Sequence, residues 1–292
     1  MRSLLFIPAD SEKKIGKALG FGADCLLLDL EDSVAPSRKA DARVLASAFI
    51  AEARHLAKRP RLFVRINALD SADWEADLQG VLPSGPDGIL LPKPRDANDV
   101  ERLAITLDHA EAKAGVPIGC TRILALAAEI PIAVLTLPTY LEASSRLDGI
   151  TWGAEDLSAQ MGSSATREPD GRWTSPYKLA RDMCLFTAVA AGRQPIDTVY
   201  VDFRNLAGLA EECRIAARDG FTGKLAIHPD QVSTINAAFT PTAAEIAWAN
   251  DIVALFRDNP NSGALSLRGQ MIDRPHAIRT ERILARAKLA GV

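Results

Sequence analysis

Cysteine, net positive charge and long apolar segments are all scarce in this sequence. The four cysteines are scattered and form no CxxC pair, so we expect reduced thiols in a cytoplasmic protein. The formal net charge of −3 lacks the basic excess that is typical of a nucleic-acid-binding protein. The apolar segment 123–138 contains a glutamate and two prolines and is too short to span a membrane. The first residues lack the apolar core and cleavage site of a signal peptide.

Signatures of several common enzyme classes are absent as well. No G-x-S-x-G, H-E-x-x-H or phosphate-binding-loop pattern occurs, so these motifs point to no hydrolase, zinc protease or P-loop enzyme. No G-x-G-x-x-G follows the first predicted strand. This counts against an open dinucleotide-binding sheet, which is the main alternative fold.

The apolar residues that are present fall into short, spaced segments. They make up 48% of the chain, against 24% charged residues, the balance of a soluble globular protein. Eight segments indicate strands, and stretches of helical period separate them. The segments are 4–8, 25–30, 61–66, 88–92, 122–129, 147–153, 197–202 and 224–229. Apolar strands that alternate with helices predict a parallel sheet, and eight such units predict a (β/α)8 TIM barrel.

We expect two parts in the chain. Residues 1–240 are predicted to form the barrel, which would be the catalytic domain. In residues 241–292 a helix is predicted at 243–257, followed by a break rich in Gly, Asn and Pro and by a second helical segment. We expect this part to be a helical arm or lid outside the closed barrel.

The predicted strands end in charged residues. In barrels of this kind the C-terminal strand ends carry the function. The second strand runs directly into three acids, and the residues at the later ends include both signs of charge. In chain order these residues are Asp29, Glu31, Asp32, Arg65, Lys93, Glu129, Asp156, Asp202 and His228. Buried ionised carboxylates are costly unless they are paired or bind a metal, so we expect the acids to meet Arg65 and Lys93 in one polar pocket.

Glu129 and Asp156 are the candidate metal ligands. Glu129 ends the fifth strand and Asp156 follows the sixth. Neighbouring strands lie about 5 Å apart, so these side chains can meet on one ion. Two carboxylates, with water and substrate oxygens as the other ligands, suit Mg2+. The alternative is that each carboxylate caps a nearby helix or pairs with a surface Lys or Arg.

Arg65 and Lys93 are candidate substrate-binding residues. Arg65 ends an otherwise apolar strand and needs an anion nearby. That anion is a substrate carboxylate or enolate, an ion-pair partner such as Glu31 or Asp32, or both. Lys93 follows the same logic, with simple solvation as the alternative. A Schiff-base role for Lys93 would require an apolar setting that lowers its pKa. His228 is expected to be a hydrogen-bonded structural residue.

Nine segments together resemble the citrate lyase beta-subunit family, which includes malyl-CoA and citramalyl-CoA lyases and lies within the HpcH/HpaI aldolase/citrate lyase superfamily. The segments are RSLLFIPAD, LLLDLEDSV, RKADAR, LFVRIN, GILLPK, WGAEDLSAQMG, IDTVYVD, GFTGKLAIHPDQV and MIDRP. They span almost the whole chain. The resemblance implies a (β/α)8 barrel, commonly a trimer, that uses Mg2+ to make or break a carbon–carbon bond next to a thioester.

The resemblance also implies roles for individual residues. Glu129 and Asp156 correspond to the metal ligands, and Arg65 to the substrate-binding arginine. Asp273, in MIDRP, corresponds to a catalytic acid or base that the C-terminal segment of a neighbouring subunit delivers. The alternative is that Asp273 only caps the final helix, or that the arm closes on its own barrel.

Further charged positions follow from this assignment. Asp29, Glu31 and Asp32 are expected to orient Arg65 and to hydrogen-bond metal-bound water. Arg2 and Lys14 are the expected contacts of the coenzyme A phosphates, by a looser match to the family.

The acyl substrate is left open by two departures from the family pattern. Ile130 and Pro131 follow the metal-binding glutamate, where the family usually has Thr, and Ala9 follows the first proline, where a glycine is common. Malyl-, citramalyl- and citryl-CoA are all candidates, on free coenzyme A or on an acyl-carrier protein. A metal-dependent aldolase of the pyruvate type and a non-catalytic barrel subunit are the alternative functions.

Overall fold

The chain, described over residues 1–292 by a computed structural model, divides into two compact units. The first comprises Met1–Asn236 and the second Ala237–Val292. None of the helices is both long and apolar enough to cross a membrane. All four cysteines are free thiols, and Cys25, Cys184 and Cys213 are buried. Burial raises the pKa of these three thiols, so they act as apolar packing residues.

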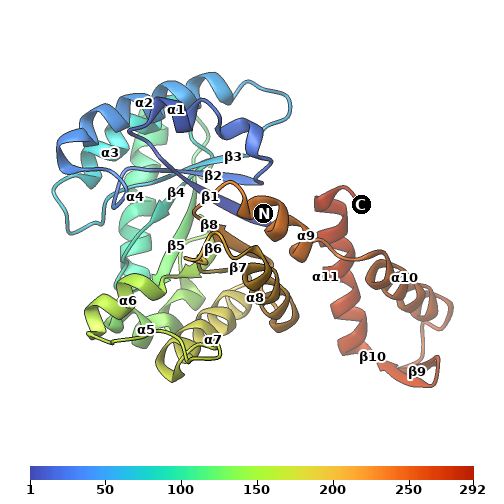
Figure 1. Ribbon diagram of the computed structural model, residues 1–292. Coiled ribbons are helices and arrows are strands. Elements are labelled where there is room, and N and C mark those ends of the chain that lie inside the picture. The colour runs from blue at the N-terminus through green and yellow to red at the C-terminus, as the bar shows by residue number, and fades with distance from the viewer. The chain divides into compact units, whose positions relative to one another are not determined.

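Eight parallel strands of the first unit close into a barrel in sequence order, and the eighth pairs with the first (Figure 1). They are β1 Ser3–Pro8, β2 Cys25–Asp29, β3 Arg61–Arg65, β4 Gly88–Leu91, β5 Arg122–Ala128, β6 Leu147–Trp152, β7 Gln194–Asp197 and β8 Gly223–Ala226. The predicted (β/α)8 barrel is confirmed.

The seventh strand lies earlier in the chain than the sequence pattern predicts. The alternating segment 197–202 indicated a strand, but β7 is Gln194–Asp197, and the chain leaves the sheet directly afterwards. Pro195 lies inside β7 and has no N–H to donate to a neighbouring strand, so the true strand lacked a typical strand pattern. Asp202 is consequently an exposed loop residue and not the end of a strand.

Helices cover the outside of the barrel (Figure 1). They are α1 Glu12–Ile15, α2 Lys39–Ala53, α3 Trp74–Val81, α4 Ala97–Ala114, α5 Pro131–Thr136, α6 Ala154–Met161, α7 Ser175–Ala190, α8 Leu206–Asp219 and α9 Gln231–Phe239. Local sequence sets the ends of α4. The Asp96 side chain accepts a hydrogen bond from the Asn98 N–H at its start, and Gly115, with a φ of 68°, ends it. Both devices satisfy backbone groups that the helix leaves free.

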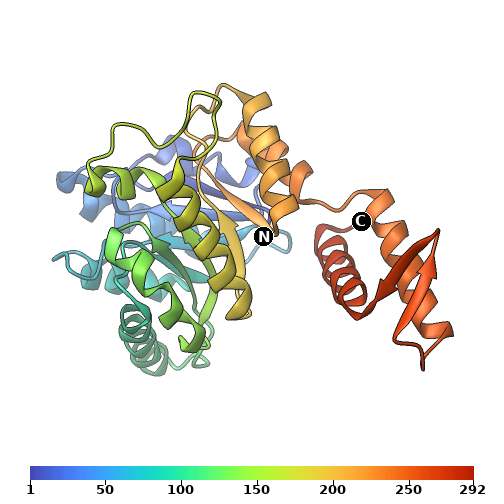
Figure 2. The ribbon, with the colours of Figure 1, turned by 90° about the horizontal axis from the view of Figure 1, so that it is seen from below.

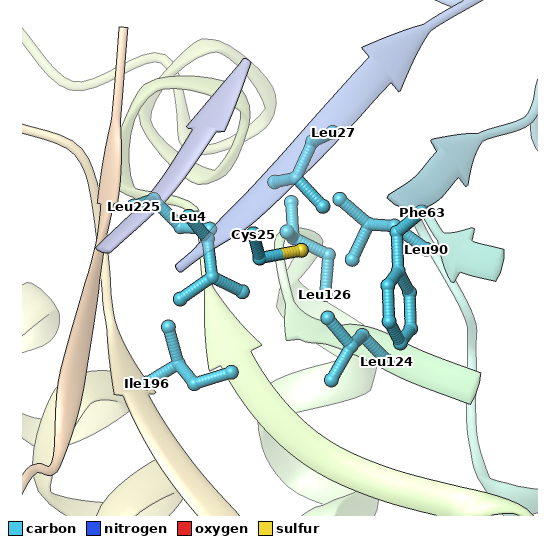
Figure 3. Packing of buried hydrophobic residues seen from close by; sticks show 9 residues of the cluster. All are labelled: Leu4, Cys25, Leu27, Phe63, Leu90, Leu124, Leu126, Ile196 and Leu225. Atoms are coloured by element: carbon cyan, nitrogen blue, oxygen red, sulfur yellow. The ribbon is translucent and has the colours of Figure 1, made fainter. Parts of the chain in front are cut away.

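The inside of the barrel is filled by apolar side chains (Figure 3). The buried residues are Leu4, Cys25, Leu27, Phe63, Leu90, Leu124, Leu126, Ile196 and Leu225. β6 contributes Gly149 instead, because a Cβ there would lie 2.9 Å from Leu124 Cδ2. Each large apolar side chain contributes roughly 1.5–3 kcal/mol by burial. These packed side chains hold the strands in place, and with them the residues at the strand ends.

A group of buried charges lies between the barrel wall and its helices. Lys224 of β8 places Nζ 3.1 Å from Asp197 Oδ2 and 2.8 Å from Glu212 Oε1. Arg181 of α7 places Nε 3.4 Å from Asp197 Oδ1, and Trp152 Nε1 donates a hydrogen bond to the same oxygen. Glu212 also pairs with Arg167, and Arg181 with Asp219, so each acid of this group contacts at least one cation. We call Arg181, Asp197, Glu212 and Lys224 the balanced cluster.

The second unit contains two helices joined by a hairpin (Figure 2). Its elements are α10 Ala243–Asp258, β9 Ala264–Leu267, β10 Gln270–Asp273 and α11 Arg274–Ala290. The sequence predicted the helices but only a break between them. Arg268 and Gly269, with φ values of 52° and 81°, form the two-residue turn that suits a hairpin. Ile283 packs inside the unit, whereas Ile278 and Leu289 are exposed.

Candidate active site

The C-terminal ends of β2 to β6 bring together seven of the predicted charged residues. Asp29 and Arg65 end β2 and β3, Glu129 directly follows β5, and Asp156 lies in the first turn of α6. The full set is Asp29, Glu31, Asp32, Arg65, Lys93, Glu129 and Asp156. We call it the mouth cluster.

Asp29 fixes Arg65. The two residues are partners in the parallel register of β2 and β3. The Asp29 carboxylate accepts hydrogen bonds from Arg65 Nε at 2.7 Å and from Nη2 at 2.6 Å. Burial alone would raise the pKa of Asp29, but the bonds from Arg65 outweigh it and lower the pKa. The Phe6 ring lies against the guanidinium, with 4.8 Å between Arg65 Cζ and the ring centroid. Arg65 is thus a rigid, permanent cation.

Glu31 and Asp32 connect the two cations of the mouth cluster. Glu31 Oε2 lies 2.8 Å and Asp32 Oδ2 3.8 Å from Arg65 Nη1. Lys93 Nζ lies 2.7 Å from Glu31 Oε1 and 3.0 Å from Asp32 Oδ2. Burial raises the pKa of Glu31 to about 7, although Arg65 and Lys93 oppose the shift. All three acids that were expected to orient Arg65 contact it, and Asp29 is the one that accepts two hydrogen bonds from it.

Lys93 has an unusual backbone conformation between two prolines. Its φ of 49° lies in the left-handed region, which few residues other than glycine occupy. In this conformation its N–H donates to Glu129 Oε2 at 2.8 Å, and its Nζ lies 3.3 Å from Asp156 Oδ1. Burial would lower the pKa of Lys93, but the hydrogen bond that Nζ donates to Glu31 and the charges of nearby acids outweigh it and raise the pKa. A Schiff-base lysine requires the opposite shift, so Lys93 acts here as a cation.

Glu129 is a buried acid with few partners. Only 2% of its surface is exposed, and the Lys93 N–H makes the one hydrogen bond to its carboxylate. Burial raises the pKa of Glu129 well above its ordinary value, and the charges of Asp156 and Glu31 raise it further. Gly153 provides the space for this side chain, because an added Cβ there would lie 2.7 Å from Glu129 Cγ.

Negative charge exceeds positive charge in the mouth cluster. Five acids face two cations, Arg65 and Lys93. No group of three His, Cys, Asp or Glu side chains is arranged to hold a metal by itself. The arrangement therefore offers a cation the oxygens of five carboxyl groups, more than Arg65 and Lys93 balance.

The two residues predicted to contact coenzyme A phosphates lie in different places. Arg2 precedes β1, at the N-terminal ends of the strands, and its guanidinium and backbone N–H bind Asp24. Because the first and last residues of a strand lie at opposite ends of the barrel, the structure does not bring Arg2 to the mouth. Lys14 lies on α1, which follows β1 at the mouth end, and is exposed.

Asp273 lies in the second unit, at the N-cap position of α11. Its Oδ1 lies 2.7 Å from His276 Nδ1. The sequence singled out Asp273 but gave no role to His276, although an acid followed by a side chain three residues later is a familiar helix-start spacing. Asp29 was likewise grouped with its neighbouring acids, and only the strand register shows that it is the main partner of Arg65.

Comparison with known proteins agrees with this geometry. Residues 2–229 match the family described as HpcH/HpaI aldolase/citrate lyase, and residues 178–292 match the family described as C–C bond lyase of the TIM-barrel fold. Citrate lyase subunit beta from Leuconostoc mesenteroides subsp. cremoris is 33% identical over 97% of this chain and 92% of its own. Mitochondrial citramalyl-CoA lyase from Mus musculus is 34% identical over 94% of this chain and 82% of its own.

A solved structure is similar over nearly the whole chain. The protein CitE from Mycobacterium tuberculosis, in complex with magnesium, acetoacetate and coenzyme A, has a TM-score of 0.79 and 32% identity, covering 99% of this chain and all (100%) of that one. Another structure from the same organism, a citrate lyase beta subunit with oxaloacetate and magnesium, has a TM-score of 0.69 and 33% identity, covering 82% of this chain and 97% of that one. The resemblance expected from the sequence is confirmed: the chain belongs to the HpcH/HpaI aldolase/citrate lyase family.

Proposed function

We propose that this protein is a Mg2+-dependent lyase that cleaves or forms a carbon–carbon bond in a 3-hydroxyacyl-CoA thioester. The products of cleavage are acetyl-CoA and an oxo-acid, and malyl-, citramalyl- and citryl-CoA are the candidate substrates. The observation that carries the proposal is the excess of acids in the mouth cluster beside the fixed cation Arg65. Relatives named citrate lyase subunit beta and citramalyl-CoA lyase support the same reaction class.

Glu129 and Asp156 are the residues that would hold Mg2+. Glu129 is buried, and its carboxylate has one hydrogen bond, whereas buried acids normally have compensating charge. Two carboxylates are the usual protein share of a Mg2+ site, with water and substrate oxygens as the other ligands. The residues present therefore fit the ion. When bound, Mg2+ polarises the substrate's hydroxyl and carboxylate oxygens.

Arg65 stabilises the negative charge that develops on the thioester oxygen as the bond breaks. Its guanidinium has five N–H groups, and the Asp29 carboxylate accepts hydrogen bonds from two of them, through Nε and Nη2. Glu31 Oε2 forms an ion pair with Nη1 at 2.8 Å but no hydrogen bond, so N–H groups are left for a substrate oxygen. Because Asp29 and the Phe6 ring hold the guanidinium in place, little reorganisation is needed when the charge appears, which is the main source of such catalysis.

Glu31, Asp32 and Lys93 orient the site. Glu31 and Asp32 contact both Arg65 and Lys93, so they set the distance between the two cations. Because both Glu31 oxygens and Asp32 Oδ2 face these cations, Asp32 Oδ1 is the oxygen available to water bound by the metal. Lys93 is the second cation at the mouth and is assigned to the substrate carboxylate. We assign Lys14, exposed on α1, to the coenzyme A phosphates, and we do not retain Arg2.

Asp273 is the proposed acid or base at the carbon atom that becomes the acetyl methyl group. It lies outside the barrel strands, on the helical arm that begins near residue 241, and we assign it to the site of a neighbouring subunit in a homo-oligomer, a trimer. Exposed apolar residues on α5 and α7, such as Leu135 and Phe186, offer surface for subunit contacts. The free thiols suit a cytoplasmic enzyme.

A substrate panel tests the proposal. The protein is incubated with Mg2+ and with malyl-, citramalyl- or citryl-CoA, and release of acetyl-CoA is followed, with citryl acyl-carrier protein as a further substrate. Cleavage of one thioester that stops with EDTA supports the lyase. If the protein turned over pyruvate with an aldehyde but no thioester, the result would favour the aldolase. If it turned over none of these substrates, the result would favour a non-catalytic subunit.

Mixing two inactive variants tests the assignment of Asp273. Arg65→Ala and Asp273→Ala oligomers are dissociated together and reassembled, with subunit exchange verified by mass. If the arm works in a neighbouring site, mixed oligomers recover activity, because some sites combine an intact Arg65 with an intact Asp273. Verified exchange without recovery would place both residues of a site in one chain.

A further inference from the structure

A cavity of about 280 Å3 lies beyond the C-terminal ends of β6 and β7. Its lining comes from the first turn of α6, from the loop between α6 and α7, and from the residues that follow β7. Glu155 is the lining residue of α6, and it directly precedes Asp156, a proposed Mg2+ ligand. The cavity therefore begins next to the mouth cluster.

Apolar side chains form most of the cavity wall. Ala165, Trp173, Val199 and Val201 line it. Val199 also packs against the apolar side chains that fill the inside of the barrel. The Trp173 ring lies 5.0 Å from the ring of Trp152, the last residue of β6. These contacts attach the wall to the strand ends, and we call the cavity the apolar pocket.

Arg167 is the one cation that lines the apolar pocket, and its guanidinium is already engaged. Its Nη2 lies 2.6 Å from Glu212 Oε2, and its Nη1 donates a hydrogen bond to the Gly171 carbonyl oxygen at 2.9 Å. The Trp173 ring covers one face, with 3.6 Å between Arg167 Cζ and the ring centroid. The other charge of the lining is the exposed carboxylate of Glu155. The pocket thus offers an incoming carboxylate an acid and no uncompensated cation.

The three candidate substrates differ in one substituent. In each of them, one carbon atom carries a carboxylate, a hydroxyl group and the thioester arm. The fourth group on this atom is hydrogen in malyl-CoA, methyl in citramalyl-CoA and carboxymethyl in citryl-CoA. An alkyl group gains about fourfold in affinity for each CH2 that is buried, whereas a carboxylate buried without a counter-charge is strongly disfavoured.

We infer that the apolar pocket takes this fourth substituent and that the substituent is an alkyl group. The inference rests on the proposed lyase function and deepens it, because it names the class of oxo-acid product, a 2-oxo acid with an apolar side chain. Among the three candidates it selects citramalyl-CoA, whose oxo-acid is pyruvate. The volume of about 280 Å3 far exceeds the roughly 15 Å3 that one water molecule needs, so chains longer than methyl also fit.

A series of 2-oxo acids tests the pocket in the condensing direction. Glyoxylate, pyruvate, 2-oxobutyrate and oxaloacetate are each incubated with acetyl-CoA and Mg2+, and the hydroxyacyl-CoA product is measured by mass spectrometry. We expect kcat/KM to be higher for pyruvate and 2-oxobutyrate than for oxaloacetate. Val201→Phe fills the pocket from an exposed position. It should lower kcat/KM for 2-oxobutyrate about 10-fold, with the value for glyoxylate within about twofold.

Val44→Phe is the matched control, because it makes the same change at an exposed position of α2, and it should behave as the wild type. Should Val201→Phe unfold at a lower temperature than this control, Val201→Leu replaces it. Two results would overturn the inference. One is a preference of the wild type for oxaloacetate over pyruvate. The other is a ratio of kcat/KM for 2-oxobutyrate to that for glyoxylate that Val201→Phe leaves unchanged.

NMR of valine methyl groups locates the alkyl chain without any turnover. The Mg2+-loaded protein, with labelled valine methyl groups, is titrated with 2-oxobutyrate. We expect nuclear Overhauser contacts between the terminal methyl group of 2-oxobutyrate and the methyl groups of Val199 and Val201, and the absence of contacts to both valines would overturn the inference. If the wild type joins acetyl-CoA to none of the oxo acids, the proposed function fails, but this spectrum still decides whether the pocket takes an alkyl chain.

Discussion

The barrel contains two groups of charged side chains, each with buried members, that differ in whether acids and cations balance. In the balanced cluster, burial would raise the pKa of Asp197, but Lys224 and Arg181 outweigh it and lower the pKa. In the mouth cluster five acids face two cations, and the pKa of Glu31 and of Glu129 is raised. Burial acts on both groups, so the counter-charge makes the difference. Acids in a cleft with strongly raised pKa values are candidates for a functional site.

Removing one acid from the mouth cluster should have the largest effect on activity. Glu129→Gln keeps the shape of the side chain but removes a proposed Mg2+ ligand. Because a bound metal supplies several kcal/mol of charge stabilisation, we expect acetyl-CoA release to fall by roughly a thousandfold. Glu142→Gln, at an exposed acid on the barrel surface, is the control and should be as active as the wild type. Near-normal turnover in Glu129→Gln would remove this residue from the site.

The same chemical change in the balanced cluster should act on stability instead. Asp197→Asn leaves Lys224 and Arg181 short of a buried partner, and breaking such a pair costs about 3–5 kcal/mol. We expect a matching loss in the free energy of unfolding by urea. Metal-free Glu129→Gln should be as stable as the wild type or more stable, since it relieves a repulsive site. Equal losses in both variants would show that the two groups do not differ as described.

The substitution Arg65→Lys should separate the effect of the positive charge at position 65 from the effect of its two-pronged contact with Asp29. The charge is kept, but the two-pronged contact with Asp29 is lost. We expect kcat to fall about 100-fold together with a weaker affinity for substrate. If KM alone changed, Arg65 would bind the ground state and its role on the developing charge would be wrong.

A smaller effect is expected in the pH dependence of stability. The pKa of Glu31 is raised from 4.5 to about 7 in the folded protein, so the folded chain binds more protons than the unfolded chain between these values. The free energy of unfolding contributed by Glu31 therefore decreases as pH rises through this range. Thermal unfolding of the metal-free protein should show the decrease, and Glu31→Gln should show less of it. An identical pH dependence in wild type and variant would contradict the raised pKa.

The strands were predictable where apolar residues recur regularly. They were not predictable where a proline or a turn conformation of the backbone sets the structure. Seven strands follow from their apolar segments. Pro195 hid β7, because a proline is not expected inside a strand, and the residues on either side of the Arg268–Gly269 turn have no sequence pattern typical of strands. The mouth cluster was predictable because parallel strands end on one side of the barrel. The same reasoning, applied strictly, would have placed Arg2 at the opposite end.

The pairings between individual side chains could not be predicted from the sequence. The bond from the Lys93 N–H to Glu129 depends on a left-handed backbone that no local sequence rule indicates for a lysine between prolines. The pairing of Asp273 with His276 depends on where α11 begins, and helix boundaries are the part of a sequence pattern with the least information.

The central claim is that the mouth cluster binds a divalent cation through Glu129 and Asp156, and calorimetric titration with MgCl2 tests this most directly. The titration is run near neutral pH, without substrate, in two buffers of different ionisation enthalpy. Acids with a raised pKa must lose protons to bind a metal, so the account predicts one Mg2+ per chain with release of protons, and weaker binding in Glu129→Gln. Absence of binding to the wild type, or binding with undiminished affinity in Glu129→Gln, would contradict it.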